Sequence, residues 1–257
     1  MFGPVPRTVW RRLIAPDEEN RIRLSVRALL VRAPGCTILI DTGFGDRFGD
    51  REAAAYGPDP GRGVEAALAE AGFSPEDVDV VVLTHLHTDH AGGAVKERAG
   101  TLVPAFPRAR YVVSEREWKV ACDRSLPRAG AYRTDDFLPL REAGALDLVG
   151  DGADLGHGVR VVRTGGHTEG HLAVLMDGGD APAAYLSDLV PTRHHVRVPY
   201  VAAVDLYPVE LMERKLEMLN AAARDRWLLV LDHDPENAVG RVAQVAPGRH
   251  RFEPCAA

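Results

Sequence analysis

Short apolar runs recur along the chain and alternate with turns rich in glycine, proline and aspartate. Runs of about four to eight residues rich in Val, Ile and Leu are typical of buried β-strands. Pro34-Gly35 separates the first two runs, so these are predicted to form a hairpin. The full pattern predicts strands over residues 22–32, 37–40, 78–84, 111–113, 146–149, 159–162, 172–176, 183–187 and 227–231.

Helical spacing of apolar residues is clearest from Glu210 to Arg224 and predicts an amphipathic helix there. Shorter helices are predicted at 64–71 and at 115–121, the latter opened by a capping box between Ser114 and Glu117. Two further segments are predicted to be irregular: a long loop over residues 44–63 and a partly helical stretch over 124–145.

The composition of the 257 residues, with a formal charge of −6 and a pI near 5.9, is that of a soluble globular protein and argues against a general nucleic-acid binder. No apolar window approaches the ~20 residues that a membrane span needs. The amino terminus lacks the apolar core of a signal peptide, so we expect a cytoplasmic location. Three cysteines far apart in the sequence suggest reduced thiols and not a disulfide framework.

One stretch concentrates metal-binding chemistry. Thr84-His85-Leu86-His87-Thr88-Asp89-His90 carries three imidazoles and one carboxylate within six residues, directly after a predicted buried strand. Imidazole nitrogen and carboxylate oxygen are ligands that zinc prefers. The following Gly92-Gly93 allows a close approach of the backbone. The alternative, a polar surface turn that happens to be rich in histidine, is less favoured because the HxHxDH spacing is specific.

Other predicted strands also end in turns that carry histidine or aspartate. If the equivalent ends of these strands are aligned, seven side chains converge at one edge: His85, His87, Asp89, His90, His171, Asp188 and His233. Asp41, at the end of the strand 37–40, could orient a metal-bound histidine or could simply cap its turn, and both readings are open.

The HxHxDH motif, the stretch Gly166-His167-Thr168-Glu169-Gly170-His171, and the later Asp188 and His233 resemble the pattern of the metallo-β-lactamase superfamily. The resemblance spans residues 22 to about 235 and includes Leu39-Ile40-Asp41-Thr42-Gly43. It implies an α/β fold of the αββα type, with two central mixed sheets flanked by helices. We therefore expect residues 1–257 to be a single domain of this fold, with residues 1–20 as an N-terminal arm.

The resemblance also implies how the ligands are shared. One ion takes His85, His87 and His171, the other takes Asp89, His90 and His233, and Asp188 bridges the two. His167 is not expected to be a ligand and is given a structural role. Two divalent metal ions are expected, most plausibly zinc, although iron, manganese or cobalt suit the same donors.

A pair of such ions lowers the pKa of a shared water toward neutrality, so the expected reaction is hydrolysis by a metal-bridging hydroxide. Asp188 is expected to be catalytic as the bridging ligand, and Asp89 is expected to be catalytic as a proton acceptor. The expected partner is a small-molecule substrate, without nucleic acid or membrane, and a homodimer is possible from the apolar arm.

Features of the resemblance narrow the substrate. Asp188 stands where secreted β-lactamases commonly have cysteine, which disfavours antibiotic hydrolysis. The insertion of RNA-processing nucleases and the extra domain of flavin-linked members are missing. The chain continues for about 24 residues after His233, which weakens a resemblance to the glutathione thioesterases known as glyoxalase II. The prediction is therefore hydrolysis of a lactone or carboxylic ester, as in N-acyl-homoserine lactonases.

One departure from the lactonase pattern affects this prediction. Lactonases of this kind place a tyrosine three residues after the bridging aspartate, and Pro191 stands there in this chain. The candidates for its role beside the substrate are His195, Tyr200 and Tyr207. The alternatives are a phosphotriesterase that hydrolyses organophosphates, a thioester hydrolase using the same site, and a metal-binding protein without turnover.

Overall fold

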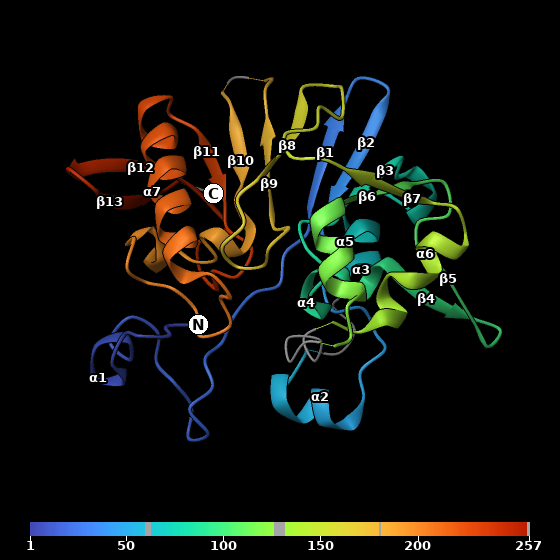
Figure 1. The fold of residues 1–257 in the computed structure, drawn as a ribbon, viewed down its shortest axis with the longest axis horizontal. Coiled ribbons are helices and arrows are strands. Elements are labelled where there is room, and N and C mark those ends of the chain that lie inside the picture. The colour runs from blue at the N-terminus through green and yellow to red at the C-terminus, as the bar shows by residue number, and fades with distance from the viewer. Residues whose placement is uncertain (60–62, 126–131, 180, 256–257) are drawn as a thin grey trace. The chain divides into compact units, whose positions relative to one another are not determined.

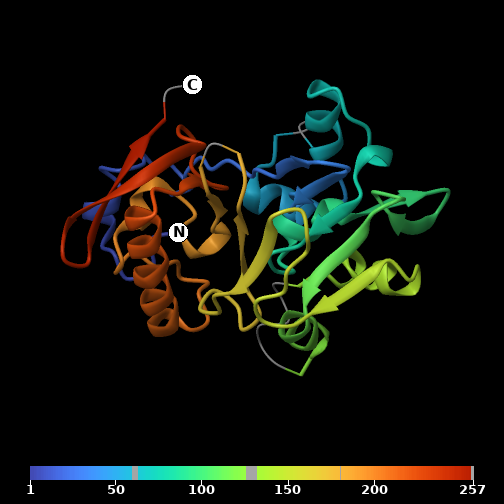
Figure 2. The same cartoon turned by 90° about the horizontal axis from the view of Figure 1, so that it is seen from above.

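A five-stranded sheet and a six-stranded sheet organise the chain in the computed structural model, which describes residues 1–59, 63–125, 132–179 and 181–255 (Figure 1, Figure 2). The residues fall into two compact units. The middle unit comprises Val26–Gly150, and the terminal unit comprises Met1–Ser25 together with Asp151–Ala257. The predicted fold class, α/β with two central sheets and helices beside them, is confirmed. The single domain over residues 1–257 stays a prediction.

The sheet of the middle unit has the strand order β1-β2-β3-β6-β7. The strands are β1 (Leu29–Ala33), β2 (Cys36–Ile40), β3 (Val80–Val82), β6 (Arg110–Ser114) and β7 (Leu146–Val149). β1 and β2 form the predicted antiparallel hairpin, and β2, β3, β6 and β7 then pair in parallel. Because β2 and β3 run in the same direction, the residues that follow Ile40 and Val82 leave the sheet at the same edge.

The helices predicted at 64–71 and 115–121 in the middle unit are confirmed, whereas the segment 44–63 differs from the prediction. The segment expected to be one loop contains α2 (Asp50–Tyr56), which the sequence analysis missed because it has no clear apolar periodicity. The other helices are α3 (Val64–Glu70), η1 (Pro75–Asp77), α4 (Thr88–Ala91), η2 (Gly92–Ala94), α5 (Glu115–Cys122), η4 (Thr134–Asp136) and α6 (Leu138–Glu142). Between them, β4 (Val95–Arg98) and β5 (Thr101–Pro104) form a two-stranded sheet.

The start of α5 differs in part from the predicted capping box. Ser114 caps the helix as expected, because its hydroxyl accepts hydrogen bonds from the backbone N–H groups of Arg116 and Glu117. The carboxylate of Glu117, however, is buried and accepts from the Leu86 N–H and the Tyr132 hydroxyl. The tertiary structure thus uses Glu117 to hold the metal-motif loop, in addition to its place in the helix.

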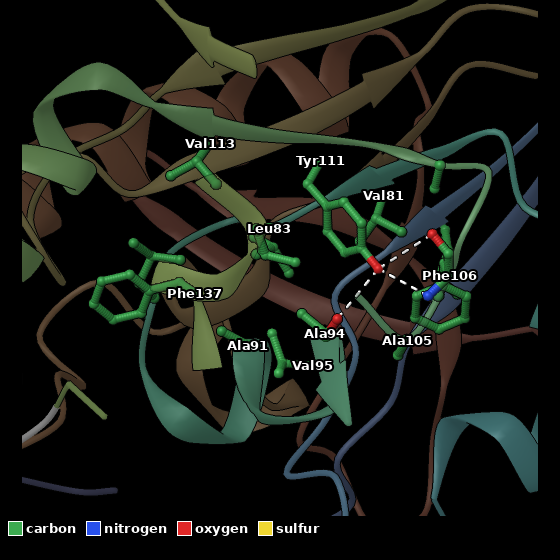
Figure 3. Close-up of a cluster of buried hydrophobic side chains, with 14 of the residues drawn as sticks. Val81, Leu83, Ala91, Ala94, Val95, Ala105, Phe106, Tyr111, Val113 and Phe137 are labelled. Atoms are coloured by element: carbon green, nitrogen blue, oxygen red, sulfur yellow. Dashed lines mark hydrogen bonds between the residues drawn. The ribbon is translucent and has the colours of Figure 1, made fainter. Parts of the chain in front are cut away.

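Figure 3 shows part of the apolar core of the middle unit, to which Val81, Leu83, Tyr111 and Phe137 belong. The buried Tyr111 hydroxyl accepts a hydrogen bond from the Phe106 N–H at 2.9 Å and donates one to the Ala94 carbonyl at 3.2 Å (Figure 3). Burial raises the pKa of this hydroxyl, so it stays protonated and able to donate. The segment that leaves the motif is thereby fixed to the central sheet.

The sheet of the terminal unit has the strand order β13-β12-β11-β10-β9-β8. The strands are β8 (Val159–Arg163), β9 (Leu172–Met176), β10 (Ala183–Tyr185), β11 (Leu228–Val230), β12 (Val239–Ala246) and β13 (Arg249–Pro254). β10 and β11 are parallel, and β9 is antiparallel to both β8 and β10. The C-terminal ends of β8, β10 and β11 therefore lie at the same edge of this sheet.

Helix α7 (Pro208–Arg224) confirms the predicted helix and starts two residues earlier, with proline in its first turn. Its buried positions are Leu211, Lys215, Leu219 and Ala222, which have the spacing of one helix face. α7 packs beside β12, as Figure 2 also shows, and covers the apolar cluster of the sheet. The other helices of this unit are α1 (Arg7–Trp10), η5 (Ser187–Leu189) and η6 (Arg193–Val196).

The predicted strand over residues 22–32 is correct only in its second half. Residues 22–28 have no regular secondary structure, and the hairpin begins at Leu29. Within this segment, the Ser25 N–H donates a hydrogen bond to the carbonyl of His233, in the irregular segment that follows β11. Among the described residues, none of the helices is long and apolar enough to cross a lipid bilayer.

Candidate metal centre

The HxHxDH segment begins as soon as β3 ends, as the sequence predicts. The rings of His85 and His90 are buried and lie 4.1 Å apart between centroids, and the His87 ring lies 4.6 Å from that of His85. Asp89 and His90 belong to the single turn of α4, with Asp89 more exposed at 31% of its side chain. The middle unit therefore brings the four predicted ligands of this motif into one cluster.

Asp41 accepts three hydrogen bonds from the HxHxDH segment and the threonine before it. Its Oδ2 accepts hydrogen bonds from Nδ1 of His90 at 2.9 Å and from the Thr84 hydroxyl at 2.9 Å, and its Oδ1 accepts from the Thr84 N–H at 2.8 Å. The residue is 1% exposed and has a φ of 58°, in the left-handed region. A non-glycine residue in this conformation is uncommon, and here it turns the carboxylate toward the motif.

These contacts fix the tautomers of two histidines. A carboxylate oxygen only accepts, so His90 donates from Nδ1 and carries its lone pair on Nε2. Thr84 gives its one hydroxyl proton to Asp41, so at its 3.2 Å contact with Nδ1 of His85 the hydroxyl is the acceptor. Both rings consequently carry their lone pair on Nε2, the nitrogen that can coordinate a metal.

The glycines after the motif allow a close approach between two loops of the middle unit. A Cβ atom on Gly92 would lie 2.2 Å from the Phe44 carbonyl oxygen, and one on Gly93 would lie 2.3 Å from that of Thr42. The Thr42 N–H also donates to the His90 carbonyl at 2.8 Å. The loop after Asp41 and the loop after His90 can therefore touch only because Gly92 and Gly93 have no side chain.

In the terminal unit, the turn after β8 carries His171. Its Nδ1 lies 2.6 Å from the Thr164 hydroxyl oxygen, which also lies 3.2 and 3.3 Å from the carbonyl oxygens of Gly165 and His171. When the single hydroxyl proton is given to one of these carbonyls, the hydroxyl oxygen accepts from Nδ1, and Nε2 is then the nitrogen that can coordinate a metal. His171 is fully buried.

His233 follows β11 and is oriented in the same way. Its Nδ1 donates to the carbonyl of Ser25 at 2.8 Å, and a carbonyl can only accept. Its backbone N–H is bound by the carbonyl of Pro191 at 3.0 Å. The Nε2 atom lies 3.1 Å from Oδ1 of Asp188 and 3.5 Å from the buried carboxylate of Asp232. Asp188 and His233 are brought together because β10 and β11 are parallel neighbours.

Asp188 lies between two imidazoles. Its Oδ2 is 2.8 Å from Nε2 of His167, and its Oδ1 faces His233. Burial by itself would favour the neutral acid, but the charges and hydrogen bonds of His167 and His233 hold the pKa of Asp188 well below its usual range. This shift favours the ionised carboxylate, which is the form that can bind a metal.

The ring of His167 contacts a second carboxylate through its other nitrogen. Nδ1 is 2.7 Å from Oδ1 of Asp205. Burial lowers the pKa of His167, but the nearby charges of Asp188 and Asp205 outweigh this effect and raise the pKa to about 10. The structure thus gives His167 two carboxylate partners, Asp188 and Asp205.

The three candidates for a place beside the substrate differ in their surroundings. His195 is buried, stacks on Phe2 with centroids 5.0 Å apart, and has both ring nitrogens hydrogen-bonded, to the Thr192 hydroxyl and the Met1 carbonyl. Tyr200 is partly buried, and its hydroxyl accepts from Arg197 at 2.9 Å. Tyr207 is 36% exposed, and its backbone N–H donates to the Gly166 carbonyl at 2.8 Å.

The donor set fits divalent metal ions within each unit separately. Four imidazoles have Nδ1 held by an oxygen, which is the arrangement that metal-binding histidines usually have. Their oxygen partners are Thr84 for His85, Asp41 for His90, Thr164 for His171 and Ser25 for His233. Carboxylates stand close by, with Asp89 in one unit and Asp188 in the other. This supports the reading of Asp41 as an orienting residue over that of a simple turn cap.

Comparison with known protein families identifies the superfamily that the sequence motifs resemble. The model of the Metallo-beta-lactamase superfamily matches residues 21–233 of the chain. The chain belongs to the metallo-β-lactamase superfamily. The predicted superfamily is thereby confirmed.

Two relatives of known name within the superfamily illustrate its range. The chain is 24% identical over 188 residues to the N-acyl homoserine lactonase AttM of Rhizobium radiobacter. This match covers 69% of this chain and 66% of AttM. It is 36% identical over 137 residues to the hydroxyacylglutathione hydrolase of Cupriavidus taiwanensis. This match covers 53% of this chain and 44% of that enzyme. The chain thus spans slightly less than two thirds of the length of AttM and under half of the second relative.

Two solved structures have the same fold. A probable metal-dependent hydrolase from Staphylococcus aureus superimposes with a TM-score of 0.89 at 24% identity, over 100% of this chain and 92% of the other. AidC, a dizinc quorum-quenching lactonase, gives a TM-score of 0.73 at 21% identity, over 91% of this chain and 80% of AidC.

Several residues around the ligands were not singled out from the sequence. They are Thr84, Thr164, Ser25, Asp205 and Asp232. Thr84 and Thr164 could have been found, since Thr84 ends a predicted strand and Thr164 follows one by two residues, and a histidine turn comes after each. Ser25 acts through its carbonyl, which any residue type has, and Asp205 lies 38 residues from His167, so neither carries a local signal.

Proposed function

We propose that the protein is a dinuclear-metal hydrolase, with zinc as the metal, that opens a lactone or cleaves a carboxylic ester. The match to the metallo-β-lactamase superfamily carries this proposal, together with four histidines whose Nδ1 atoms are held by oxygens. The proposed ligands are those of the superfamily pattern: His85, His87 and His171 for one ion, Asp89, His90 and His233 for the other, and Asp188 for both.

When bound, a pair of divalent ions supplies Lewis acidity and lowers the pKa of water toward neutrality. The part of the protein is to hold the donor atoms in place. Asp41 and Thr84 fix two rings in the middle unit, and Thr164 fixes one in the terminal unit. Asp89, whose carboxylate side chain is 31% exposed, is the proposed acceptor for the proton released from water.

The choice of a lactone or ester rests on the relatives and on the chemistry of the ligands. AttM is named as an N-acyl homoserine lactonase, and Asp188 is a carboxylate, as the lactonase-like pattern requires. Tyr207 is our proposed replacement for the tyrosine that Pro191 displaces, because its side chain is exposed and its backbone is bonded to the loop of His167. His195 is a weaker candidate because both of its ring nitrogens are already engaged.

A second candidate function is the hydrolysis of a glutathione thioester. The observation in its favour is the 36% identity to a hydroxyacylglutathione hydrolase, which is higher than the identity to AttM but covers only 53% of this chain. The same proposed metal centre would serve both reactions, since each begins with attack of water on a carbonyl carbon.

The decisive experiment is a substrate panel run on samples of measured metal content. Zinc-loaded and metal-stripped protein would be assayed with an N-acyl-homoserine lactone, an aryl ester, a hydroxyacylglutathione thioester and a phosphotriester. The proposal expects the highest kcat/KM on the lactone or ester, loss of activity on stripping, and recovery with zinc. A preference for the thioester would support the second candidate, and preference for the phosphotriester would overturn both.

The role of Asp188 is tested with a matched pair of variants. Asp188→Ala is expected to lower kcat by at least about a thousandfold, because the bridging ligand is lost. Asp225→Ala removes an exposed carboxylate that pairs with Arg224, and this variant is expected to keep normal activity. Zinc-loaded protein with no turnover on any substrate of the panel would favour a metal-binding protein without catalysis.

A further inference from the structure

A line of three side chains in the terminal unit connects Asp188 to a residue outside the superfamily pattern. Oδ1 of Asp205 lies 2.7 Å from Nδ1 of His167, and Nε2 of His167 lies 2.8 Å from Oδ2 of Asp188. The three side chains are 2%, 1% and 13% exposed in that order. Contacts this short between buried charged groups are strong and directional.

We propose that Asp205 is a positioning residue that acts through His167 to set the orientation of the Asp188 carboxylate. The proposal rests on the proposed function to the extent that Asp188 is taken to be a metal ligand. Its first step concerns the ring of His167. Carboxylate oxygens only accept, so both nitrogens of the ring donate, and the ring is fixed at both ends.

Asp205 is itself held from several sides, which gives it the rigidity to position another group. Its Oδ2 accepts from the Ala202 N–H at 2.6 Å. The next two residues pair with the turn of His167: the Leu206 N–H donates to the His167 carbonyl at 3.0 Å, and the Tyr207 N–H to the Gly166 carbonyl at 2.8 Å. The loop that carries Asp205 and the turn that carries His167 therefore move as one piece.

The turn that carries His167 also packs against the start of α7. A Cβ atom on Gly166, where φ is +81°, would lie 2.6 Å from the Cα and Cβ atoms of Leu211, so only glycine allows this packing. The Leu211 side chain is fully buried in the core of the terminal unit. Asp205 and His167 are thus supported by a helix and not only by each other.

Asp188 needs such support because its own position is less constrained. It lies in the single turn η5 directly after β10 and keeps 13% of its side chain exposed. A hydrogen bond from His167 to Oδ2 limits rotation of the carboxylate and directs Oδ1 toward His233, 3.1 Å away. His167 has no lone pair left for a metal in this arrangement, and its role is to orient a ligand.

The test is a double-mutant cycle of Asp205→Asn and His167→Gln, read out by zinc affinity and by the absorption spectrum of the cobalt-substituted protein. Asp205→Asn alone is expected to weaken zinc binding about ten- to a hundredfold and to change the cobalt spectrum. In the His167→Gln background the same change is expected to have no further effect, because Asp205 acts through that ring. Asp225→Asn, at an exposed ion pair, is the control.

The proposal is overturned if Asp205→Asn binds zinc normally with an unchanged cobalt spectrum, or if the two losses add. Additive losses would mean that Asp205 merely holds the loop of residues 202–207. If the unmodified protein bound no metal, the proposed function would fail. The coupling between Asp205 and His167 would then be measured by urea unfolding of the same variants without metal. If the two substitutions lowered the urea midpoint additively, the proposed coupling would be overturned. Should Asp205→Asn not fold, an unchanged cobalt spectrum in His167→Gln would overturn the proposal.

Discussion

Nδ1 of His90 donates a 2.9 Å hydrogen bond to Oδ2 of Asp41, a residue 49 positions earlier in the chain, and both side chains are almost completely buried. The same oxygen accepts the Thr84 hydroxyl, which in turn accepts from His85. One carboxylate therefore orients two of the imidazoles of the HxHxDH motif, one directly and one through a threonine.

Asp41→Asn is expected to weaken zinc binding about ten- to a hundredfold, because an amide cannot replace both oxygens as acceptors. If the asparagine carbonyl oxygen accepts from the Thr84 N–H, its NH₂ group faces the other two donors, the Thr84 hydroxyl and Nδ1 of His90. Competition with a chromophoric chelator measures the affinity. Asp147→Asn, at an exposed ion pair with Arg110, is the matched control. An Asp41→Asn protein with unchanged affinity would show that Asp41 only shapes its turn.

Thr164→Val tests the corresponding contact in the terminal unit. Valine keeps the shape of threonine but leaves Nδ1 of His171 without the hydroxyl that lies 2.6 Å away. We expect zinc affinity to fall roughly tenfold and unfolding stability to fall by about 1–3 kcal/mol, since a buried donor loses its acceptor. Thr101→Val, at an exposed position of β5, should change neither quantity. Equal affinity in the two variants would contradict the orienting role of Thr164.

Gly92→Ala is expected to destabilise the protein by about 1–3 kcal/mol through overpacking and to reduce zinc occupancy. The added Cβ would meet the Phe44 carbonyl at 2.2 Å, although the backbone of Gly92 has an ordinary helical φ of −60°. The effect is therefore steric. Gly150→Ala places its Cβ in open space and serves as the control in urea unfolding. A normal midpoint for Gly92→Ala would mean that the two loops separate without cost.

The buried ring of His195 is expected to make the folded protein less stable in acid. Burial, and then the charge of Lys215, lower its pKa to about 3, so the native protein holds the ring neutral while the unfolded chain protonates it near pH 6.5. The unfolded state then binds more protons between pH 6.5 and 3, so stability falls as the pH falls through this window. The loss is of the order of a few kcal/mol, since each unit of pKa difference corresponds to about 1.4 kcal/mol.

His195→Gln removes this titration and should make stability less dependent on pH between 6.5 and 3, even if the variant is less stable at pH 7. Urea unfolding at several pH values measures the slope. His157→Gln, in an exposed turn, should retain the slope of the unmodified protein. If His195→Gln kept the same slope, other groups would be responsible for the acid sensitivity.

Much of the fold and many of the site residues could be predicted because they depend on short-range patterns. The apolar runs predicted β2, β3, β6, β8 and β9 and the helix α7 within a few residues. The spacing of His85, His87, Asp89 and His90 in one turn predicted a cluster, and the structure brings them together in the middle unit. These features arise from neighbouring residues, so a sequence window contains their cause.

Other features were decided by contacts between distant segments. Helix α2 was missed because its residues have no clear apolar period, and residues 22–28 alternate without forming a strand. His195 could be taken for a loop histidine until the fold buried it under Phe2.

By itself, the sequence determined which residues can bind metal and which superfamily the chain resembles, because ligand types and their spacing are local properties. Only the tertiary structure decided which nitrogen of each histidine is available and what orients it. Asp41 reaches His90, Ser25 reaches His233, and Asp205 reaches His167 across 49, 208 and 38 residues. Hydrogen bonds over such separations depend on strand order and parallel pairing, which no sequence window contains.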